Sequence, residues 1–431
     1  MPKKIKLKNY SFLVYGLGST GNSVIRYFKK NKISKYFIWD DNNTIRKKFK
    51  KKKTINLKET FKKVDFIVLS PGISLRKTKN KKELLRYRKK IISDIDLLYL
   101  SGKKFKSIVV TGTNGKSTTA KIIEHLLKRN KFKVQLGGNI GTPVLNLNIK
   151  ENSFVVIEAS SFHLSYSKFI LPDYALLLNI TNDHLDWHGS LQDYKKSKLN
   201  LFKLQTKKNF AFINNKFKKN FRAMKFESKL VPLQQKQYVK IKSKIKNLYL
   251  KSEANDENMS FVFTLAKKLR IRDKIFVKSM KSFSGLPHRY EIFLKSKNVT
   301  FINDSKATSF QATKFALASC KNIYWILGGL HKDKDKLELK EFRGNIVKSY
   351  IIGKNVNFFK SCLKKNNVNF SISKNLKKSV LNILKDIKLF KRSSNIVLLS
   401  PSAASFDQFD NFEERGNEFK QLCRTYAKKF I

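Results

Sequence analysis

The residues most able to do chemistry form a glycine-rich stretch, 109–118, which reads V-V-T-G-T-N-G-K-S-T. An apolar β-branched run, 107–110, precedes it, and a predicted helix follows whose apolar face is formed by Ala120, Ile123, Leu126 and Leu127. Glycine lets backbone N–H groups approach an anion, and a helix N-terminus adds partial positive charge. The stretch therefore predicts a phosphate loop in which Lys116 reaches the outer phosphates of ATP and the Ser117 hydroxyl binds Mg²⁺. It departs from the strict G-x-x-x-x-G-K-S spacing, because Val110 stands where the first glycine would be.

Two further polar stretches follow apolar runs that predict neighbouring strands of the same sheet. Glu158 comes after the run 154–157 and opens E-A-S-S-F, and His184 lies in T-N-D-H-L-D after the run 174–180. The carboxyl ends of parallel strands meet at one edge of a sheet. We therefore expect Glu158 to provide a second Mg²⁺ contact, and His184 to lie at the same functional edge as Lys116.

The first hundred residues contain a literal G-x-G-x-x-G, Gly16–Gly21, between a predicted strand and a predicted helix. The next predicted strand, 36–39, is followed by Asp40, which lies 40 − 21 = 19 residues after the last glycine. This is the layout of dinucleotide-binding folds, in which an acid contacts a ribose or a base. From the motif alone, NAD and another diphosphate are both open as ligands. The candidate ligand contacts at this edge are Asp40, Asp41, Asn42, Ser70 and Gly72.

Three α/β blocks must position these motifs. In each block apolar strand runs alternate with amphipathic helices, which predicts parallel sheets with right-handed crossovers. The third block begins near Arg289, with strands expected at 299–302, 323–327, 350–352 and 396–399. The predicted fold class is α/β with three domains. These are a Rossmann-like N-terminal domain (1–100), a central P-loop ATPase-like domain with a parallel sheet (101–288) and a Rossmann-like C-terminal domain (289–431).

The composition of the 431 residues excludes several classes of protein. Apolar residues make up 41% and aromatic residues 12%, which indicates a globular chain, and no apolar run approaches the ~18 residues of a membrane span. The net charge of +61 comes from lysines scattered through every segment without a nucleic-acid-binding pattern, so we expect no specific nucleic-acid partner. Cys320, Cys362 and Cys423 show no disulfide or metal spacing. We expect a monomeric, cytoplasmic protein without a secretory signal.

Seven motifs occur in a fixed order along the chain: Thr111–Thr118, Gly138–Gly141, Glu158–Phe162, Asn182–Asp186, Leu286–Arg289, Asn303–Thr308 and Leu399–Phe409. In that order they resemble the ATP-dependent Mur ligases of peptidoglycan synthesis, over nearly the whole chain. The last motif, continued to Gly416, and the short Gly16–Gly21 loop are most similar to the branch that adds D-glutamate, where this loop faces the UDP of the sugar substrate. The resemblance implies that ATP phosphorylates the carboxylate of UDP-N-acetylmuramoyl-L-alanine. The amine of D-glutamate then attacks the acyl phosphate, and ADP and phosphate are released.

The resemblance also implies roles for individual residues. Lys116, His184 and Lys198 take the catalytic positions, and Lys198 takes that of a carbamylated lysine. Two Mg²⁺ ions are held by Ser117, Glu158, His184 and Lys198. The ATP-binding positions are Gly112, Thr113, Asn114, Gly115, Lys116, Ser117, Thr118, Asn255, Asn258, His288, Arg289, Asp304 and Lys306. The UDP-sugar positions are Gly18, Ser19, Thr20, Asp40, Asp41, Ser70, Gly72 and Asn139. The D-glutamate positions are Thr308, Lys332, Ser405 and Phe412. The C-terminal domain is expected to close over ATP.

Three residues depart from the family pattern, namely Ala254, Trp187 and Ser309, and two rival functions stay open. One rival is another Mur-type ligase that adds a different amino acid, although no D-N-P-R-type segment marks the diamino-acid branch. The other is an NAD-dependent oxidoreductase or a nucleotide-binding protein built on Gly16, Gly18 and Gly21. That second rival would leave the Lys116, Glu158 and His184 motifs unexplained.

Overall fold

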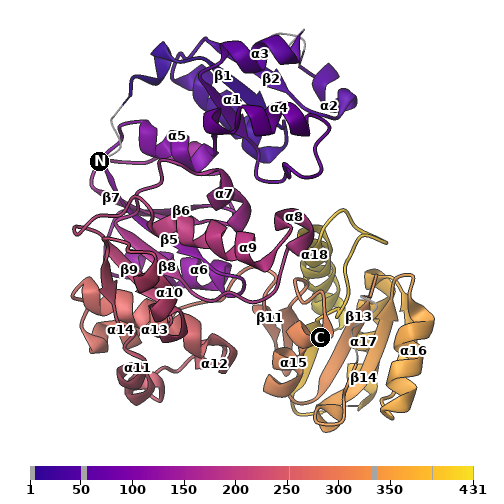
Figure 1. Ribbon diagram of the computed structural model, residues 1–431. Helices are drawn as coiled ribbons and strands as arrows, with labels where there is room; N and C mark the ends of the chain where they lie inside the picture. The colour runs from indigo at the N-terminus through magenta and orange to yellow at the C-terminus, as the bar shows by residue number, and fades with distance from the viewer. Residues whose placement is uncertain (1–4, 50–55, 252, 332–336, 391, 431) are drawn as a thin grey trace. The chain divides into compact units, whose positions relative to one another are not determined.

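A computed structural model describes residues 5–49, 56–251, 253–331, 337–390 and 392–430, and the strands in these ranges form three sheets (Figure 1). Contacts between residues divide the chain into two units. The first unit comprises 1–246 with 255–281, and the second comprises 247–254 with 282–431. The first two sheets belong to the first unit and the third sheet to the second. The predicted α/β class is confirmed, and the predicted three-domain division at 100/101 and 288/289 stays a prediction.

The first sheet has four parallel strands in the order β2-β1-β3-β4. They are β1 (Phe12–Tyr15), β2 (Tyr36–Trp39), β3 (Phe66–Leu69) and β4 (Ile91–Ile92). Their helices are α1 (Ser19–Lys30), α2 (Asn43–Lys47), α3 (Leu57–Lys63), α4 (Lys81–Arg86) and α5 (Asp94–Leu100), with 3-10 turns η1 (Leu7–Asn9) and η2 (Arg88–Lys90). A Cβ on Gly21 would collide with the Gly16 carbonyl oxygen. The last glycine of the motif is thus required for α1 to pack closely on the loop after β1.

The second sheet has six parallel strands in the order β10-β9-β8-β5-β7-β6. They are β5 (Phe105–Thr111), β6 (Val134–Gly138), β7 (Ser153–Glu158), β8 (Tyr174–Leu177), β9 (Phe210–Ile213) and β10 (Lys229–Val231). Because β5 pairs with β7 on one side and β8 on the other, the segments that follow these three strands meet at one edge. This topology brings the phosphate-loop, Glu158 and His184 motifs together, as predicted.

The next helices follow in chain order. All of them belong to the first unit except α12 and the first two residues of α13, which belong to the second unit. They are α6 (Lys116–Arg129), α7 (Ser161–Tyr166), α8 (Leu185–His188), α9 (Leu191–Leu199), α10 (Lys218–Ala223), α11 (Gln235–Lys242), α12 (Leu248–Lys251), α13 (Glu253–Lys268) and α14 (Asp273–Lys281), with 3-10 turns η3 (Val144–Asn146), η4 (Asn200–Phe202) and η5 (Asn215–Phe217). The predicted apolar face of α6 is confirmed, because each of its four residues is fully buried: Ala120, Ile123, Leu126 and Leu127.

The third sheet has six strands in the order β11-β12-β16-β13-β14-β15 (Figure 1). They are β11 (Glu291–Ser296), β12 (Val299–Asn303), β13 (Ile323–Gly328), β14 (Ile346–Ile352), β15 (Phe370–Lys374) and β16 (Asn395–Leu399). The helices are α15 (Phe310–Ser319), α16 (Val356–Lys365), α17 (Leu376–Phe390) and α18 (Phe412–Phe430), with the 3-10 turn η6 (Arg343–Asn345). The expectation of a wholly parallel sheet is wrong at one edge. Only two residues, 297 and 298, separate β11 from β12, and a connection this short joins antiparallel strands.

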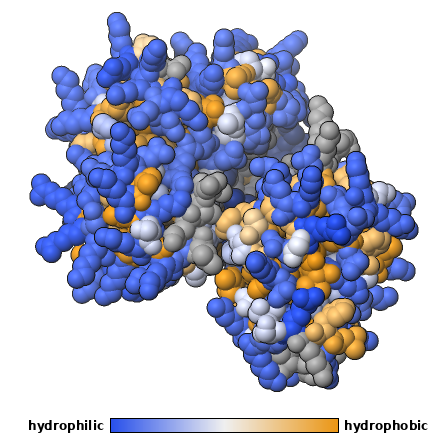
Figure 2. Space-filling model, turned by 90° about the horizontal axis from the view of Figure 1, so that it is seen from below, coloured by the Kyte–Doolittle hydropathy of each residue, from blue (hydrophilic) through white to orange (hydrophobic). Residues whose placement is uncertain are grey.

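The surface reflects the lysine-rich composition. Figure 2 shows mostly hydrophilic residues on the face it presents, with hydrophobic residues in separated groups. No helix within the described ranges is both long and apolar enough to cross a membrane.

Candidate active site

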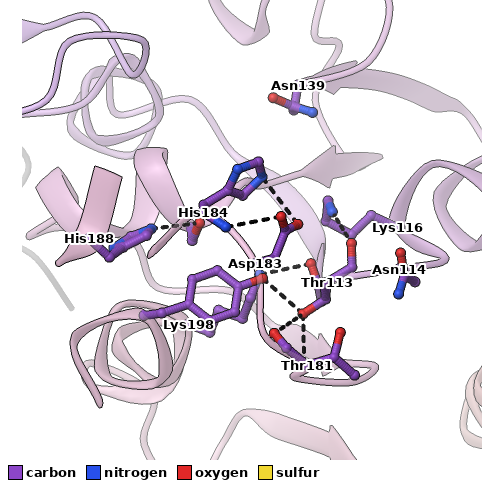
Figure 3. A network of polar contacts seen from close by, with 12 residues as sticks. Thr113, Asn114, Lys116, Asn139, Thr181, Asp183, His184, His188 and Lys198 are labelled. Carbon is purple, nitrogen blue, oxygen red and sulfur yellow. Dashed lines mark hydrogen bonds and ion pairs between the residues drawn. The ribbon is translucent and has the colours of Figure 1, made fainter. Parts of the chain in front are cut away.

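The phosphate loop joins β5 to α6, and its shape depends on one glycine. Gly115 has a φ of 80°, in the left-handed region that favours glycine, and a Cβ there would collide with Oδ1 of Asn258. Lys116 Nζ donates to the Thr113 carbonyl at 2.7 Å, so the side chain folds back over its own loop (Figure 3). The predicted loop residues 112–118 therefore lie at the start of α6, beside Asn258 of α13.

The segment after β8 holds the phosphate loop from the other side. The Asn114 N–H donates to Oδ1 of Asn179 at 2.8 Å, and the Thr113 N–H donates to the Asn179 carbonyl at 2.9 Å. The Thr181 N–H donates to Oγ1 of Thr113 at 3.0 Å, and the hydroxyls of Thr113 and Tyr194 lie 2.8 Å apart. The contacts with Asn179 and Thr181 join the ends of β5 and β8, and the contact with Tyr194 joins the loop to α9, so neighbouring segments order the loop.

Asn255 and Asn258 of α13 lie beside the phosphate loop and the start of α6. Nδ2 of Asn258 donates to Oδ1 of Asn255 at 3.0 Å, and the hydroxyl of Thr119 on α6 donates to Oδ1 of Asn258 at 3.2 Å. Both asparagines are buried. The structure thus places these two predicted ATP residues against the first turns of α6.

Glu158 ends β7 with its carboxylate buried at the same edge. Its Oε1 accepts a hydrogen bond from Nδ2 of Asn139 at 3.0 Å, whereas its Oε2 is buried without a hydrogen-bond partner among the described residues. Ser117, also buried, lies in the first turn of α6. An unpaired carboxylate oxygen in a buried position is strongly disfavoured unless a cation or donor reaches it. These residues fit a Mg²⁺ ion, which prefers oxygen ligands.

Lys198 lies on α9 and is 1% exposed. Its Nζ donates to the Gly112 carbonyl at 2.7 Å and lies 4.7 Å from the centre of the Tyr194 ring. Burial, together with the positive charge of Lys116, lowers the pKa of Lys198 to about 7. Lys198 is therefore a buried amine beside the phosphate loop rather than a solvated surface lysine.

His184 lies at the start of α8 in a left-handed conformation, with a φ of 51°. Its side chain is 46% exposed, with Nε2 3.3 Å from Oδ2 of Asp183 and the ring centre 4.7 Å from that of Phe162 (Figure 3). Within the described residues, no three His, Cys, Asp or Glu side chains gather as a metal cluster. The predicted metal set thus relies on Ser117 and Lys198 in addition to Glu158 and His184.

The Gly16–Gly21 edge carries the residues predicted for the UDP-sugar. The carboxylate of Asp40 accepts from the Leu17 N–H at 2.7 Å and the Asn42 N–H at 2.9 Å, so it shapes the glycine loop. The Ser70 hydroxyl donates to the Gly16 carbonyl at 2.8 Å. The carboxylate of Asp41 is already engaged by Tyr15, Trp39, Thr78 and Asn80, at 2.6 to 3.1 Å. Asp40 thus accepts two internal hydrogen bonds and Asp41 accepts four, so Asp40 has more capacity left to bind a ligand. The contacts with UDP stay predictions.

Comparison with known proteins agrees with this geometry. Residues 110–275 match the Mur ligase middle domain, and residues 10–86 match the Mur ligase MurD-like N-terminal domain. The UDP-N-acetylmuramoylalanine–D-glutamate ligase of Rickettsia felis is 34% identical over 96% of this chain and 97% of its own length. The ligase of the same name from Buchnera aphidicola is 36% identical over 96% and 97%. The chain belongs to the Mur ligase family.

Solved structures show that this Mur ligase shares its fold with relatives of low sequence identity. The MurC ligase of Thermotoga maritima aligns with a TM-score of 0.57 at 15% identity, over 96% of this chain and 99% of that one. The MurF ligase of the same organism, solved with ADP, aligns with a TM-score of 0.55 at 16% identity, over 98% and 100%. The likeness covers nearly the whole chain and concerns the fold alone.

The second unit of this Mur ligase carries the remaining predicted residues. Asp304 is buried, and its carboxylate accepts from the Tyr290 N–H at 3.0 Å and the Ser400 hydroxyl at 2.7 Å. Burial raises the pKa of Asp304 to about 7. His288 is buried with a φ of 62°, and its carbonyl accepts from the Lys306 N–H at 3.0 Å. The predicted ATP residues of this unit thus lie on two adjacent segments: His288 and Arg289 before β11, and Asp304 and Lys306 after β12.

The predicted D-glutamate residues lie where three segments of this unit meet. The Lys306 ammonium sits 4.6 Å from the centre of the Phe412 ring, and the Phe412 carbonyl accepts from the Ser305 hydroxyl. Thr308 follows on the same loop as Lys306. Ser405 is buried in a turn and does not cap a helix, because α18 begins at Phe412 and Asn411 caps it. Lys332 lies outside the described residues.

Arg415 lies within the last sequence motif, as continued to Gly416, and no role was predicted for it. Its side chain is 1% exposed and donates to the Ser305 hydroxyl at 3.0 Å, to the Ser305 carbonyl at 2.8 Å and to the Ala403 carbonyl at 3.1 Å. It therefore joins α18 to the loops after β12 and β16. Tyr194 was likewise missed as a contact of Thr113, although it lies four residues before Lys198 and so on the same helical face.

Proposed function

We propose that this Mur ligase joins D-glutamate to UDP-N-acetylmuramoyl-L-alanine in an ATP-dependent reaction, in cytoplasmic peptidoglycan precursor synthesis. The observation that carries the proposal is the meeting of three groups at one sheet edge. These are Lys116 on the phosphate loop, the carboxylate of Glu158, one oxygen of which has no hydrogen-bond partner among the described residues, and the buried amine of Lys198. Full-length relatives that bear this enzyme's name support the choice of substrates.

The chemistry proceeds by two substitutions. An oxygen of the substrate carboxylate attacks the γ-phosphorus of ATP, the bond to the β–γ bridging oxygen breaks, and ADP leaves. The D-glutamate amine then attacks the acyl carbon, loses a proton, and expels phosphate as the amide forms. Because phosphoryl transfer needs positioning and charge neutralisation above all, Lys116 is assigned to the phosphoryl oxygens. The N–H groups at the start of α6 bind the phosphates.

Two Mg²⁺ ions are proposed, held by Ser117, Glu158, His184 and Lys198. When bound, such ions neutralise phosphate charge and polarise the oxygens that react. The unpaired Oε2 of Glu158 supports this assignment, as does its second oxygen, which Asn139 orients.

Lys198 is proposed to ligate one ion as a carbamate. A cationic amine cannot bind Mg²⁺. A neutral amine can attack the carbon of CO₂, forming an N–C bond, and lose a proton to give the carbamate R–NH–COO⁻, which supplies oxygen ligands. With a pKa of about 7, roughly half of the Lys198 amines are neutral at pH 7, whereas an ordinary lysine is almost wholly charged. Burial thus prepares this one lysine for the modification.

Substrate recognition is proposed to divide between the units. The UDP-sugar contacts Gly18, Ser19, Thr20, Asp40, Asp41, Ser70, Gly72 and Asn139. D-glutamate contacts Thr308, Lys332, Ser405 and the backbone of Phe412. ATP contacts the loop 112–118 with Asn255, Asn258, His288, Arg289, Asp304 and Lys306. The protein is proposed to act as a monomer, which light scattering of the purified chain would test.

Phosphate release tests the proposed function. Purified protein with ATP and Mg²⁺ should release phosphate only when UDP-N-acetylmuramoyl-L-alanine and D-glutamate are both present. L-alanine, L-glutamate and a diamino acid serve as matched controls for the amino acid. Preference for one of these would keep the fold and chemistry but overturn the D-glutamate assignment. Reduction of NAD with no phosphate release would overturn the reaction itself.

A further inference from the structure

A cavity lies in the first unit, and its wall includes residues of α8 and α9. Its volume is about 560 Å³. Residues 74–76, α4 and Arg88 form one wall, and the end of α7, α8 and α9 form the other. The walls are joined by the Tyr166 hydroxyl, which donates to the Ile73 carbonyl at 2.5 Å, and by an ion pair of 3.0 Å between Lys77 and Asp186. None of the residues proposed above for ATP, Mg²⁺, the UDP-sugar or D-glutamate lines this cavity.

The charges around the cavity are strongly one-sided. A single carboxylate, Asp193, lies on its wall, and Arg76 pairs with it at 3.5 Å. Six cationic side chains line the cavity: Arg76, Lys81, Arg88, Lys168, Lys196 and Lys203. A cleft lined by charges of one sign concentrates the opposite charge within it. The cavity therefore favours an anion with more than one charge.

Backbone carbonyls fix the side chain of Lys168 in the wall of the cavity. Its Nζ donates to the carbonyls of Arg88 and Lys89, at 2.8 and 2.6 Å. Burial lowers the pKa of Lys168 to about 8. The negative charge of Asp96 opposes this shift, whereas the positive charges of Arg88 and Lys203 add to it. Among the described residues, no carboxylate lies within ion-pair distance of Lys168, Arg88 or Lys203. The chain therefore compensates the positive charge of these three side chains only in part, through Asp96 near Lys168.

One end of the cavity is aromatic. The Trp187 ring lies 5.6 Å from that of Tyr166, and its Nε1 is buried without an acceptor among the described residues. The indole offers both a flat apolar surface and an unused donor. Such a combination suits a ligand that has an acceptor or ring in addition to its charges.

We propose that this cavity binds a small anion with two or more phosphate groups, at a site separate from those of the ligase reaction. Its volume lies in the usual range of small-molecule sites, roughly 300–1,000 Å³. The cations Arg88, Lys168 and Lys203 bind the phosphates, and Trp187 contacts the remainder of the ligand. On α9, Lys196 and Ser197 line the cavity, while Tyr194 and Lys198 point to the opposite side, toward the phosphate loop.

Isothermal titration with inorganic pyrophosphate tests the proposal in the full-length chain. The test variant is Arg88→Gln with Lys203→Gln, two exposed side chains whose loss leaves the fold intact. The control is Lys364→Gln with Lys365→Gln, exposed on α16 of the other unit, which removes the same charge. Because both variants keep the phosphate loop, any pyrophosphate bound there is common to them. We expect the test variant to bind at least about tenfold more weakly at one site, with the control unchanged.

Equal binding by wild type, test variant and control would overturn the proposal, as would equal weakening in both variants. Titration with UDP separates two sources of the phosphates. A UDP affinity above that of pyrophosphate that is lost in Trp187→Leu supports a nucleotide. Equal affinities support a ligand recognised through its phosphates alone. Since binding is measured without turnover, the result is independent of the proposed ligase activity.

Discussion

Replacing Lys198 by alanine tests the proposed carbamate. The amine is 1% exposed and lies 2.7 Å from the Gly112 carbonyl, at the base of the loop that carries Lys116. If its carbamate helps to hold an ion that neutralises the transferring phosphoryl group, Lys198→Ala should lower kcat by on the order of 10²–10³-fold. An effect of this size corresponds to about 3–4 kcal/mol of transition-state stabilisation.

The free energy of unfolding should change much less than the activity. Loss of the donor to Gly112 destabilises by about 1–3 kcal/mol, and deletion of buried methylenes by about 2–5 kcal/mol. Burial of the charged amine destabilises the wild type, because folding lowers the pKa of Lys198 from 10.5 to about 7. Below pH 7 this cost is about 5 kcal/mol, and the variant, which has no amine, does not incur it. Because the folded pKa is depressed, the unmodified wild type should gain stability between about pH 7 and pH 10.5, and the variant should not.

The assay is phosphate release, with guanidinium unfolding as the control for folding. Short carboxylic acids such as acetate should restore part of the activity of Lys198→Ala, because a carboxylate can occupy the place of the carbamate. Lys198→Met, which keeps the volume but has no amine, should be inactive and equally rescued. Lys198→Arg should be inactive because guanidinium stays cationic. Wild-type turnover by Lys198→Arg would refute the reasoning, since it would show that the residue supplies only positive charge.

Four further outcomes are expected. Lys116→Ala should lower kcat by about 10²-fold or more while the melting temperature stays close to that of the wild type; wild-type turnover would contradict the assignment. Asp40→Ala should raise KM for the UDP-sugar and leave KM for ATP unchanged, because its carboxylate holds the Leu17 N–H of the glycine loop, and equal changes in both would argue against separate sites. Ser405→Ala should raise KM for D-glutamate severalfold, and Lys332→Ala should do so more strongly; a loss of stability with KM unchanged would indicate a structural serine. Asp304→Asn should remove a pH dependence of the free energy of unfolding. Because the pKa of Asp304 is raised to about 7, the wild type should lose about 1.4 kcal/mol per pH unit from about pH 4 to pH 7. Guanidinium titrations in which the stabilities of wild type and variant change equally with pH would contradict this.

Local patterns account for the elements that were predicted well. The predicted strand 36–39 is confirmed at both ends, since it is a short apolar run bounded by the polar residues Lys35 and Asp40. The phosphate loop was recognisable for a similar reason, because a glycine that must adopt a positive φ lies directly before Lys116 at a helix start. By contrast, β11 was missed because its residues are only partly buried and their apolar pattern is weak.

The candidate site was predicted as a set of motifs and was assembled by the order of the strands. Because β5 lies between β7 and β8, Gly112, Glu158 and Asn179 meet although long stretches of chain separate them. No local pattern could show that the Asp41 carboxylate is engaged by Tyr15, Trp39, Thr78 and Asn80 within the chain. The sequence could not predict that Oε2 of Glu158 lacks a hydrogen-bond partner among the described residues, because this depends on where all the surrounding donors lie in space.

The sequence by itself determined the strand runs, the phosphate loop and the motif order, because apolar periodicity and glycine geometry act between residues close in the chain. The family resemblance pointed to Lys198, and only the tertiary structure showed the surroundings that change its chemistry. Lys198 differs from a solvated lysine through its burial against a carbonyl 86 residues away and through the charge of Lys116. Desolvation and charge proximity are properties of position in space, and the packing of α9 on the phosphate loop creates both.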